Sequence, residues 1–179
     1  MKTDSADSGF VHVSIRVSAK LRNRLNREAK HRHITLNSLI NSILEKYDSF
    51  DKILQGAKAI PLSEAFFAEI LEITPTEEIE NIAKKLGAQV VRQSFASQGI
   101  EFNLDNLIEF YFEPLSEYSG WYQFNWSSAG TSRKLIFTHS HGPKWTAFLR
   151  RYYGGVIRSA TGDEPDVTVE GSVLTFTCR

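Results

Sequence analysis

A strictly alternating segment near the start of the chain constrains the fold more than any other feature of the sequence. Residues 10–17 read Phe-Val-His-Val-Ser-Ile-Arg-Val. Every second residue is apolar, namely Val11, Val13, Ile15 and Val17. The residues between them are polar, namely His12, Ser14 and Arg16. A period of two residues is typical of a half-buried β-strand, so the sequence predicts a strand here.

A short amphipathic helix is predicted directly after this strand. Ser18 stands where the N-cap of a helix belongs. Residues 19–31 then carry an apolar side chain at every fourth position, at Leu21, Leu25 and Ala29. The outer face of this helix is basic, with Lys20, Arg22, Arg24, Arg27 and Lys30.

A second helix is predicted after a break at residues 31–34. Thr35 is a candidate N-cap, and a wide apolar stripe follows it, formed by Leu36, Leu39, Ile40, Ile43, Leu44 and Tyr47. Apolar residues continue to Leu54, so this helix extends to about residue 54, where Gln55 and Gly56 should end it.

A strand and two short helices cannot form a stable unit alone. A single strand has two unpaired edges, and two short helices cannot enclose a core at this size. A second copy is the simplest partner, since two strands paired antiparallel would bury Val13, Ile15 and Val17 against four helices. The polar side chains of both strands would then point outward as a two-stranded ribbon, which fits the major groove of DNA.

Residues 11–47 resemble a ribbon-helix-helix DNA-binding domain of the methionine and Arc repressor type. The resemblance covers the alternating strand, Ser18 with the Leu21/Leu25/Ala29 helix, and the run Thr35-Leu36-Asn37-Ser38-Leu39-Ile40. It implies that the outward strand residues read bases, here His12, Ser14 and Arg16. It also implies that the start of the second helix binds phosphate, here at Thr35, Leu36 and Asn37. One departure is His33, where the family often has glycine between the helices.

The chemistry of these side chains suits DNA. Arg16 can donate two hydrogen bonds to guanine, Ser14 accepts several bases, and His12 donates or accepts according to its tautomer. Lys20, Arg22 and Arg24 are candidates for phosphate contacts, although a charged helix face is often only solvated. The alternative for the strand is a solvated face without a partner.

Charge is distributed unevenly along a chain of zero formal net charge. Residues 1–47 carry nine Lys and Arg against four Asp and Glu, a net charge of +5, and the rest of the chain carries −5. A basic head indicates a polyanionic partner. No apolar run reaches the roughly 20 residues of a membrane helix, and the polar N-terminus has no signal-peptide core. We therefore expect a cytoplasmic protein that does not enter a membrane. Cys178, the only cysteine, excludes an intrachain disulfide and a cysteine-rich zinc site.

The remainder of the chain predicts an α+β domain with a small antiparallel sheet and several helices. Helices are expected at 64–71, from Thr74-Pro75 to about Ser97, and from Asn103 until Pro114 bends or ends it. Residues 121–126 and 134–139 form one hairpin around a turn at 127–132, and residues 167–169 and 173–177 form another. Gly142-Pro143 begins the helix between them, and Gly154-Gly155 inside that helix indicates a kink or a close contact. The expected organisation is a disordered tail at 1–10, a ribbon-helix-helix domain at 11–54 and a sensing or oligomerisation domain at 58–179.

The C-terminal part contains no enzyme motif that we recognise. His139 and His141 share one side of a strand end and are candidate ligands for a transition metal, with Cys178 or a carboxylate as a third ligand. The more conservative interpretation is a polar strand end before a helix. The dense aromatic residues are either an apolar pocket for a small-molecule effector or, more simply, a packed core.

These features predict a dimeric, sequence-specific DNA-binding transcriptional regulator without enzymatic activity, leaving open whether dimers pair into tetramers. The alternative is an antitoxin of ribbon-helix-helix type whose C-terminal domain binds a protein partner. An enzyme controlled through its DNA-binding head is the least favoured interpretation.

Overall fold

The computed structural model describes residues 11–52, 54 and 59–179, and it divides the chain into two compact units. The N-terminal unit is Met1–Leu44 and the C-terminal unit is Glu45–Arg179. The predicted tail at residues 1–10 and the predicted helix stop at Gln55-Gly56 lie outside the described residues.

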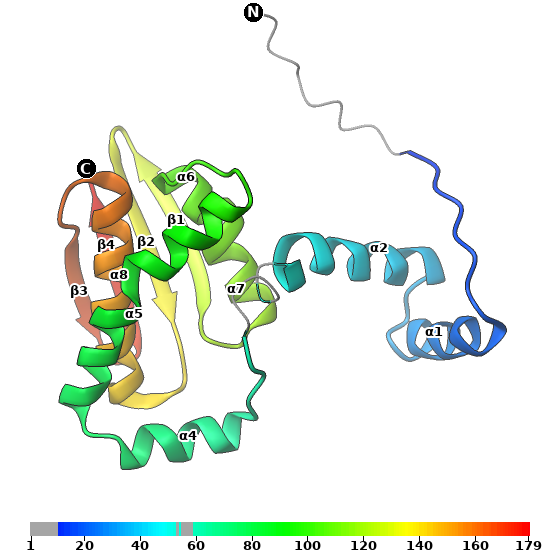
Figure 1. Ribbon diagram of the computed structural model, residues 1–179, viewed down its shortest axis with the longest axis horizontal. Coiled ribbons are helices and arrows are strands. Elements are labelled where there is room, and N and C mark those ends of the chain that lie inside the picture. The colour runs from blue at the N-terminus through cyan, green and yellow to red at the C-terminus, as the bar shows by residue number, and fades with distance from the viewer. Residues whose placement is uncertain (1–10, 53, 55–58) are drawn as a thin grey trace, which may run out of the picture. The chain divides into compact units, whose positions relative to one another are not determined.

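The N-terminal unit contains two helices, labelled in Figure 1, α1 (Ala19–His31) and α2 (Leu36–Lys46). Both predicted N-caps are confirmed, because the Ser18 hydroxyl accepts a hydrogen bond from the Leu21 amide and Thr35 accepts one from Ser38. Ala29 and Leu39 are the buried residues among those described in this unit, so most of its described apolar side chains remain in contact with solvent.

The predicted N-terminal strand is absent, and the predicted fold class is therefore wrong in this part. Residues 11–18 have no regular secondary structure and run as an open chain into α1 (Figure 1). The physical reason is that a strand needs the backbone groups of a neighbouring strand. No described segment of the same chain pairs with these residues. The protein's sheet is C-terminal, and its N-terminal unit is helical rather than a ribbon followed by helices.

The turn between α1 and α2 has a left-handed residue at the position of His33, whose φ is 55°. The Ile34 amide donates to the Ala29 carbonyl and the His33 amide to the Lys30 carbonyl. This is the Schellman arrangement, which glycine usually completes because it has no Cβ to strain. The turn therefore forms without the glycine that the resembled family often has there.

The C-terminal unit contains the remaining helices and the sheet. Its helical segments are η1 (Tyr47–Asp51), α4 (Glu64–Ile73), α5 (Thr76–Ser97), α6 (Leu104–Leu107), η2 (Ile108–Phe112), α7 (Glu113–Tyr118) and α8 (Gly142–Thr161). The predicted starts at Ser63 and Asn103 are confirmed, since both side chains cap the helices that follow them. α5 begins at Thr76, one residue later than predicted, and Gly99 follows its end with a φ of 68°.

Pro114 does not end its helix, which was one of the two expected outcomes, the other being a bend. The chain passes from α6 through the π-helical segment η2 into α7, which carries Pro114 in its first turn. A proline removes one backbone donor and crowds the preceding turn. The wider π-helical turn just before Pro114 accommodates this crowding and lets the helix continue.

The sheet has four antiparallel strands in the order β1-β2-β4-β3. The strands are β1 (Gln123–Ala129), β2 (Ser132–Thr138), β3 (Asp166–Glu170) and β4 (Val173–Cys178). Both predicted hairpins are present. The first has a shorter turn than expected, because Ser127–Ala129 belong to β1 and pair with β2.

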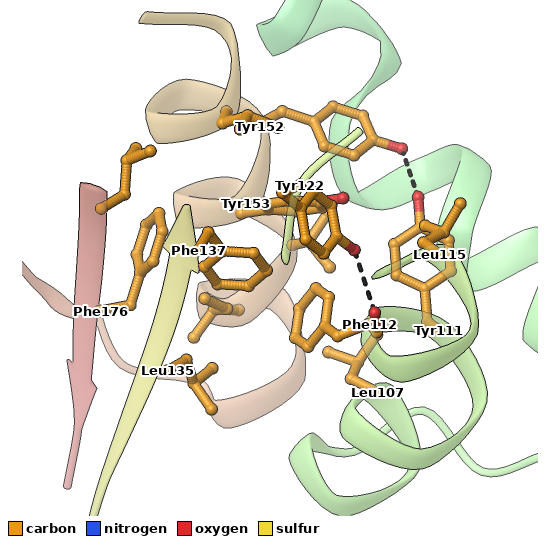
Figure 2. Close-up of a cluster of buried hydrophobic side chains, with 14 of the residues drawn as sticks. Leu107, Tyr111, Phe112, Leu115, Tyr122, Leu135, Phe137, Tyr152, Tyr153 and Phe176 are labelled. Atoms are coloured by element: carbon orange, nitrogen blue, oxygen red, sulfur yellow. Dashed lines mark hydrogen bonds between the residues drawn. The ribbon is translucent and has the colours of Figure 1, made fainter. Parts of the chain in front are cut away.

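The core lies between the sheet and α8, with α5 packed on α8 (Figure 1). Alternate residues of β2 and β4 are fully buried on this side, at Leu135, Phe137, Leu174 and Phe176. Tyr153 of α8 stacks on Phe137 with ring centroids 4.8 Å apart (Figure 2). The C-terminal unit thus has a core of its own, as the predicted α+β domain requires.

Candidate nucleic-acid interface

The N-terminal unit carries an uncompensated basic surface. Between residues 11 and 44 the chain has seven Lys and Arg and a single acidic residue, Glu28. The five basic residues predicted on the outer face of α1 are all exposed, namely Lys20, Arg22, Arg24, Arg27 and Lys30. Glu28 pairs with Arg32, the residue next to the turn, at 2.6 Å. The basic face of α1 is therefore free to attract an anion.

The three predicted base-reading residues lie together on the segment before α1. His12, Ser14 and Arg16 are exposed, and the Ser14 hydroxyl lies 3.5 Å from Nε2 of His12. That contact shows that the side chains of His12 and Ser14 point the same way.

The apolar residues that alternate with these polar ones are exposed as well. Val11 is 86% exposed, Val13 73%, Ile15 54% and Val17 42%. Several large apolar side chains left in water close together are typical of interaction surfaces. The segment thus exposes both hydrogen-bonding and apolar side chains.

The start of α2 was predicted to bind phosphate through Thr35, Leu36 and Asn37. The Thr35 hydroxyl oxygen accepts from the Ser38 amide at 3.0 Å and lies 2.8 Å from the Ser38 hydroxyl. The first turn of α2 contains no acidic residue. The amides of Leu36 and Asn37 precede the first intrahelical donor, Leu39, and helix N-termini of this kind suit an anion.

His139 and His141 each serve the local structure of the strand end. Nδ1 of His139 accepts from the His141 amide at 3.2 Å, and its Nε2 lies 3.0 Å from the Thr146 hydroxyl. Nε2 of His141 lies 2.9 Å from the Gly120 carbonyl oxygen and donates to it. Burial, and then the proximity of His141, lowers the pKa of His139. Both ring nitrogens of His139 therefore take part in hydrogen bonds, and Nδ1 does so as an acceptor, as in a neutral imidazole.

A third ligand for these histidines does not come from Cys178. Cys178 lies opposite Arg133 and Val173 lies opposite Thr138, so Cys178 is five residues along β4 from the histidine end, roughly 17 Å. Among the described residues no group of three or more His, Cys, Asp or Glu side chains could hold a metal ion. Burial raises the pKa of the Cys178 thiol, which favours its role as a small core residue.

The aromatic residues of the C-terminal unit pack against one another. Trp145 stacks on Phe148 with centroids 4.5 Å apart, and Phe148 stacks on Tyr152 at 5.2 Å. Figure 2 shows how the Tyr152 hydroxyl meets that of Tyr111, at 3.1 Å. These contacts are those of a core.

A cavity of about 580 Å³ opens elsewhere, between η1 and η2. Its lining contains apolar Ile100 and Phe110 together with polar side chains, among them Ser49, Lys52 and Glu109. Its size lies in the range of small-molecule sites. This cavity was not predictable from the sequence, because its lining comes from helical segments whose packing follows from no local sequence pattern.

Comparisons with known proteins do not identify the chain, since no family model, no curated protein and no solved structure matches it. No helix within residues 11–52, 54 and 59–179 is long and apolar enough to cross a membrane.

Proposed function

We propose that the protein is a dimeric, sequence-specific DNA-binding transcriptional regulator of the cytoplasm. The observation that carries the proposal is the composition of the N-terminal unit. In its described residues it combines exposed basic side chains, most of them outside any ion pair, with exposed apolar side chains. The first property fits a polyanion, and the second fits burial against a second copy.

The polar side chains of residues 11–17 supply base recognition in the major groove. Arg16 has the geometry for two hydrogen bonds to O6 and N7 of guanine, which discriminates against other bases by about 1–3 kcal/mol. Ser14 and His12 add contacts that tolerate more than one base. Lys20, Arg22 and the amides at the start of α2 hold phosphates and fix the orientation of the protein on the duplex.

The C-terminal unit acts as the sensing or oligomerisation domain in this proposal. Its packed core supports an independent fold, and the cavity between η1 and η2 is the place to seek a small-molecule effector. An effector that changes the affinity for DNA must itself bind more tightly to the DNA complex by the same factor. Equal effector affinity with and without operator DNA would exclude such coupling.

The proposal is tested by selecting sites from a random pool of double-stranded DNA at several salt concentrations. The wild-type protein should enrich a palindromic or repeated site. Arg16→Ala should lose about 5- to 150-fold in affinity for that site, the equivalent of 1–3 kcal/mol. Arg150→Ala is the matched control, because Arg150 is an exposed arginine of α8 in the other unit. Weak binding with a steep salt slope, no enriched site and no effect of Arg16→Ala would reject sequence reading.

Limited proteolysis distinguishes the proposed regulator from the alternative, a ribbon-helix-helix antitoxin. Partner-binding tails of that kind are often disordered when free. The C-terminal unit instead has capped helices and a packed sheet. A stable fragment of about 120 residues supports the regulator, whereas rapid digestion of the whole C-terminal unit supports an antitoxin.

A further inference from the structure

The edge strand β3 has a sequence complementary in charge and polarity to residues 12–16 of the chain. β3 is Asp166-Val167-Thr168-Val169-Glu170, and it forms one end of the sheet order β1-β2-β4-β3. Within the described residues no strand pairs with its outer edge. An edge strand presents the backbone donors and acceptors of alternate residues to solvent, and extended peptides bind by adding to such edges.

We propose that residues 12–16 of a second copy bind this edge as an added antiparallel strand, with Ser14 opposite Thr168. In this register Arg16 faces Asp166 and His12 faces Glu170. An acidic residue at each end of β3 thus meets a basic residue of the segment. The central pair consists of two hydroxyl side chains, which suit each other across strands.

The apolar residues match in the same register. Val167 and Val169 lie opposite Phe176 and Leu174, which are fully buried, so they belong to the sheet face that α8 covers. Val169 is nevertheless 41% exposed, because β3 is the last strand on that side. Ile15 would lie beside Val167, and Val13 beside Val169. The added strand would cover the open end of the core with side chains that water now surrounds.

Charge also favours this mixed pairing over two alternatives between copies. In one, residues 12–16 pair with the same residues of the second copy, and in the other, β3 pairs with β3. Antiparallel self-pairing of residues 12–16 around Ser14 places His12 opposite Arg16 of the second copy. Self-pairing of β3 around Thr168 places Asp166 opposite Glu170, two carboxylates. The mixed pairing removes the repulsion between Asp166 and Glu170 and gives these carboxylates Arg16 and His12 as partners, which is how specificity between similar partners arises. The existing pair of Asp166 with Arg179, at 3.3 Å, is exposed on both sides and therefore competes weakly.

The pairing has a regulatory consequence, and this consequence alone rests on the proposed function. Asp166 and Glu170 would occupy Arg16 and His12, the side chains proposed to contact DNA. Exchange of the segments between two copies would hold the DNA-free protein as a closed, two-fold symmetric dimer. DNA and the β3 edge would compete for the same residues.

Disulfide trapping in the full-length protein, without DNA, tests the pairing. Ser14→Cys and Thr168→Cys are made in separate chains that also carry Cys178→Ala, and the two chains are mixed under mild oxidation. Residues directly opposite in an antiparallel pair have Cα atoms about 4.5–5.5 Å apart, which a disulfide can bridge. We expect a linked dimer containing one chain of each kind. Val13→Cys is the matched control, because its side chain points to the other face of the sheet and should give at least tenfold less product with Thr168→Cys.

Several outcomes would overturn the proposal. They are no mixed dimer, equal yields from Ser14→Cys and Val13→Cys, exclusive Ser14→Cys homodimers, or a bridge that forms only within one chain carrying both cysteines. Asp166→Asn with Glu170→Gln should lower the trapped yield severalfold and raise the affinity for an enriched DNA site. Since trapping uses no DNA, a mixed dimer together with failure of the site selection would reject the proposed function and leave the pairing intact.

Discussion

The hydroxyl groups of the neighbouring residues Tyr152 and Tyr153 have opposite environments. That of Tyr152 lies 3.1 Å from the hydroxyl of Tyr111. That of Tyr153 is buried near the Tyr122 hydroxyl and makes no well-formed hydrogen bond among the described residues. Burial raises the pKa of Tyr111 and of Tyr153 well above the usual value, so both stay protonated.

We predict opposite effects for the two matching substitutions. Tyr153→Phe should stabilise the protein by about 0.5–1 kcal/mol, because it removes an unsatisfied buried hydroxyl. Tyr152→Phe should destabilise it by about 1–2 kcal/mol, because it leaves the Tyr111 hydroxyl unpaired. Urea denaturation followed by tryptophan fluorescence measures both. A Tyr153→Phe variant less stable than the wild type would show that this hydroxyl is satisfied.

His139 makes the stability of the C-terminal unit depend on pH. Its folded pKa lies below its ordinary value because burial, and secondarily His141, disfavours the imidazolium. The unfolded chain therefore takes up a proton first as the pH falls. Stability is complete above about pH 6.5 and declines below it, with a slope of up to about 1.4 kcal/mol per pH unit.

His139→Gln should flatten this decline while lowering stability at pH 8, where the native imidazole bonds Thr146 and the His141 amide. Denaturation midpoints between pH 8 and pH 5 provide the measurement. His31→Gln is the control, since His31 is an exposed histidine of α1 in the other unit. An unchanged slope in His139→Gln would assign the pH dependence to other groups.

At the scale of single residues, capping chemistry was predictable from sequence. Ser18 and Thr35 cap as expected, and Ser63 and Asn103 cap helices expected to start there, because each needs only its own side chain and an amide three residues away. The start expected at Thr74-Pro75 is the exception, since the Thr74 hydroxyl donates to the Ile70 carbonyl of α4 and does not cap α5. The hydrogen bonds of His139 were not predictable. They depend on Thr146 in the next helix, whose position follows from tertiary packing.

Helix α8 contains two adjacent glycines that the fold does not require. Gly155 has no atom within 4 Å of where a Cβ would lie, and a Cβ on Gly154 would meet only Phe176 at an ordinary 3.9 Å. α8 is a single helix from Gly142 to Thr161. The kink or close approach expected from the sequence is therefore absent.

We predict that Gly155→Ala stabilises the protein by about 0.5–1 kcal/mol, because alanine loses less backbone entropy in a helix. Gly154→Ala should give a similar gain. Gly162→Ala is the contrasting variant and should destabilise by about 1 kcal/mol, because Gly162 ends α8 with a φ of 86°. The thermal unfolding midpoints of the three variants measure these changes in stability. Destabilisation by Gly155→Ala would indicate that another chain approaches this side of α8.

At the scale of elements, the sequence predicted helices better than the N-terminal strand. A helix satisfies its backbone within one segment, so the periodicity of residues 19–31 was sufficient. The hairpins were also predictable, because each strand has its partner a few residues away. The segment 11–17 has the right alternation but no such neighbour. Its alternation is typical of a strand, but no described segment of the same chain pairs with it.

At the scale of the whole molecule, the two units differ in whether they can satisfy their own apolar surface. The C-terminal unit buries a continuous core, whereas in the N-terminal unit the described buried residues are Ala29 and Leu39. The basic head seen in the sequence coincides with this incomplete unit. The cavity between η1 and η2 arises only from packing, and the sequence contained no sign of it.

Self-association should therefore depend on residues 11–17, and Ile15→Asp should abolish it. A carboxylate at the centre of the apolar side cannot be buried against a second copy without a large desolvation cost. We expect the wild type to sediment as a dimer at micromolar concentration and Ile15→Asp as a monomer. The near-ultraviolet circular dichroism of the C-terminal aromatic core should be unchanged. Ile73→Asp is the control, because Ile73 of α4 is 79% exposed, more than the 54% of Ile15. If Ile73→Asp dissociates the dimer and Ile15→Asp does not, the copies meet through the C-terminal unit, and the exposed apolar side of residues 11–17 needs a different partner.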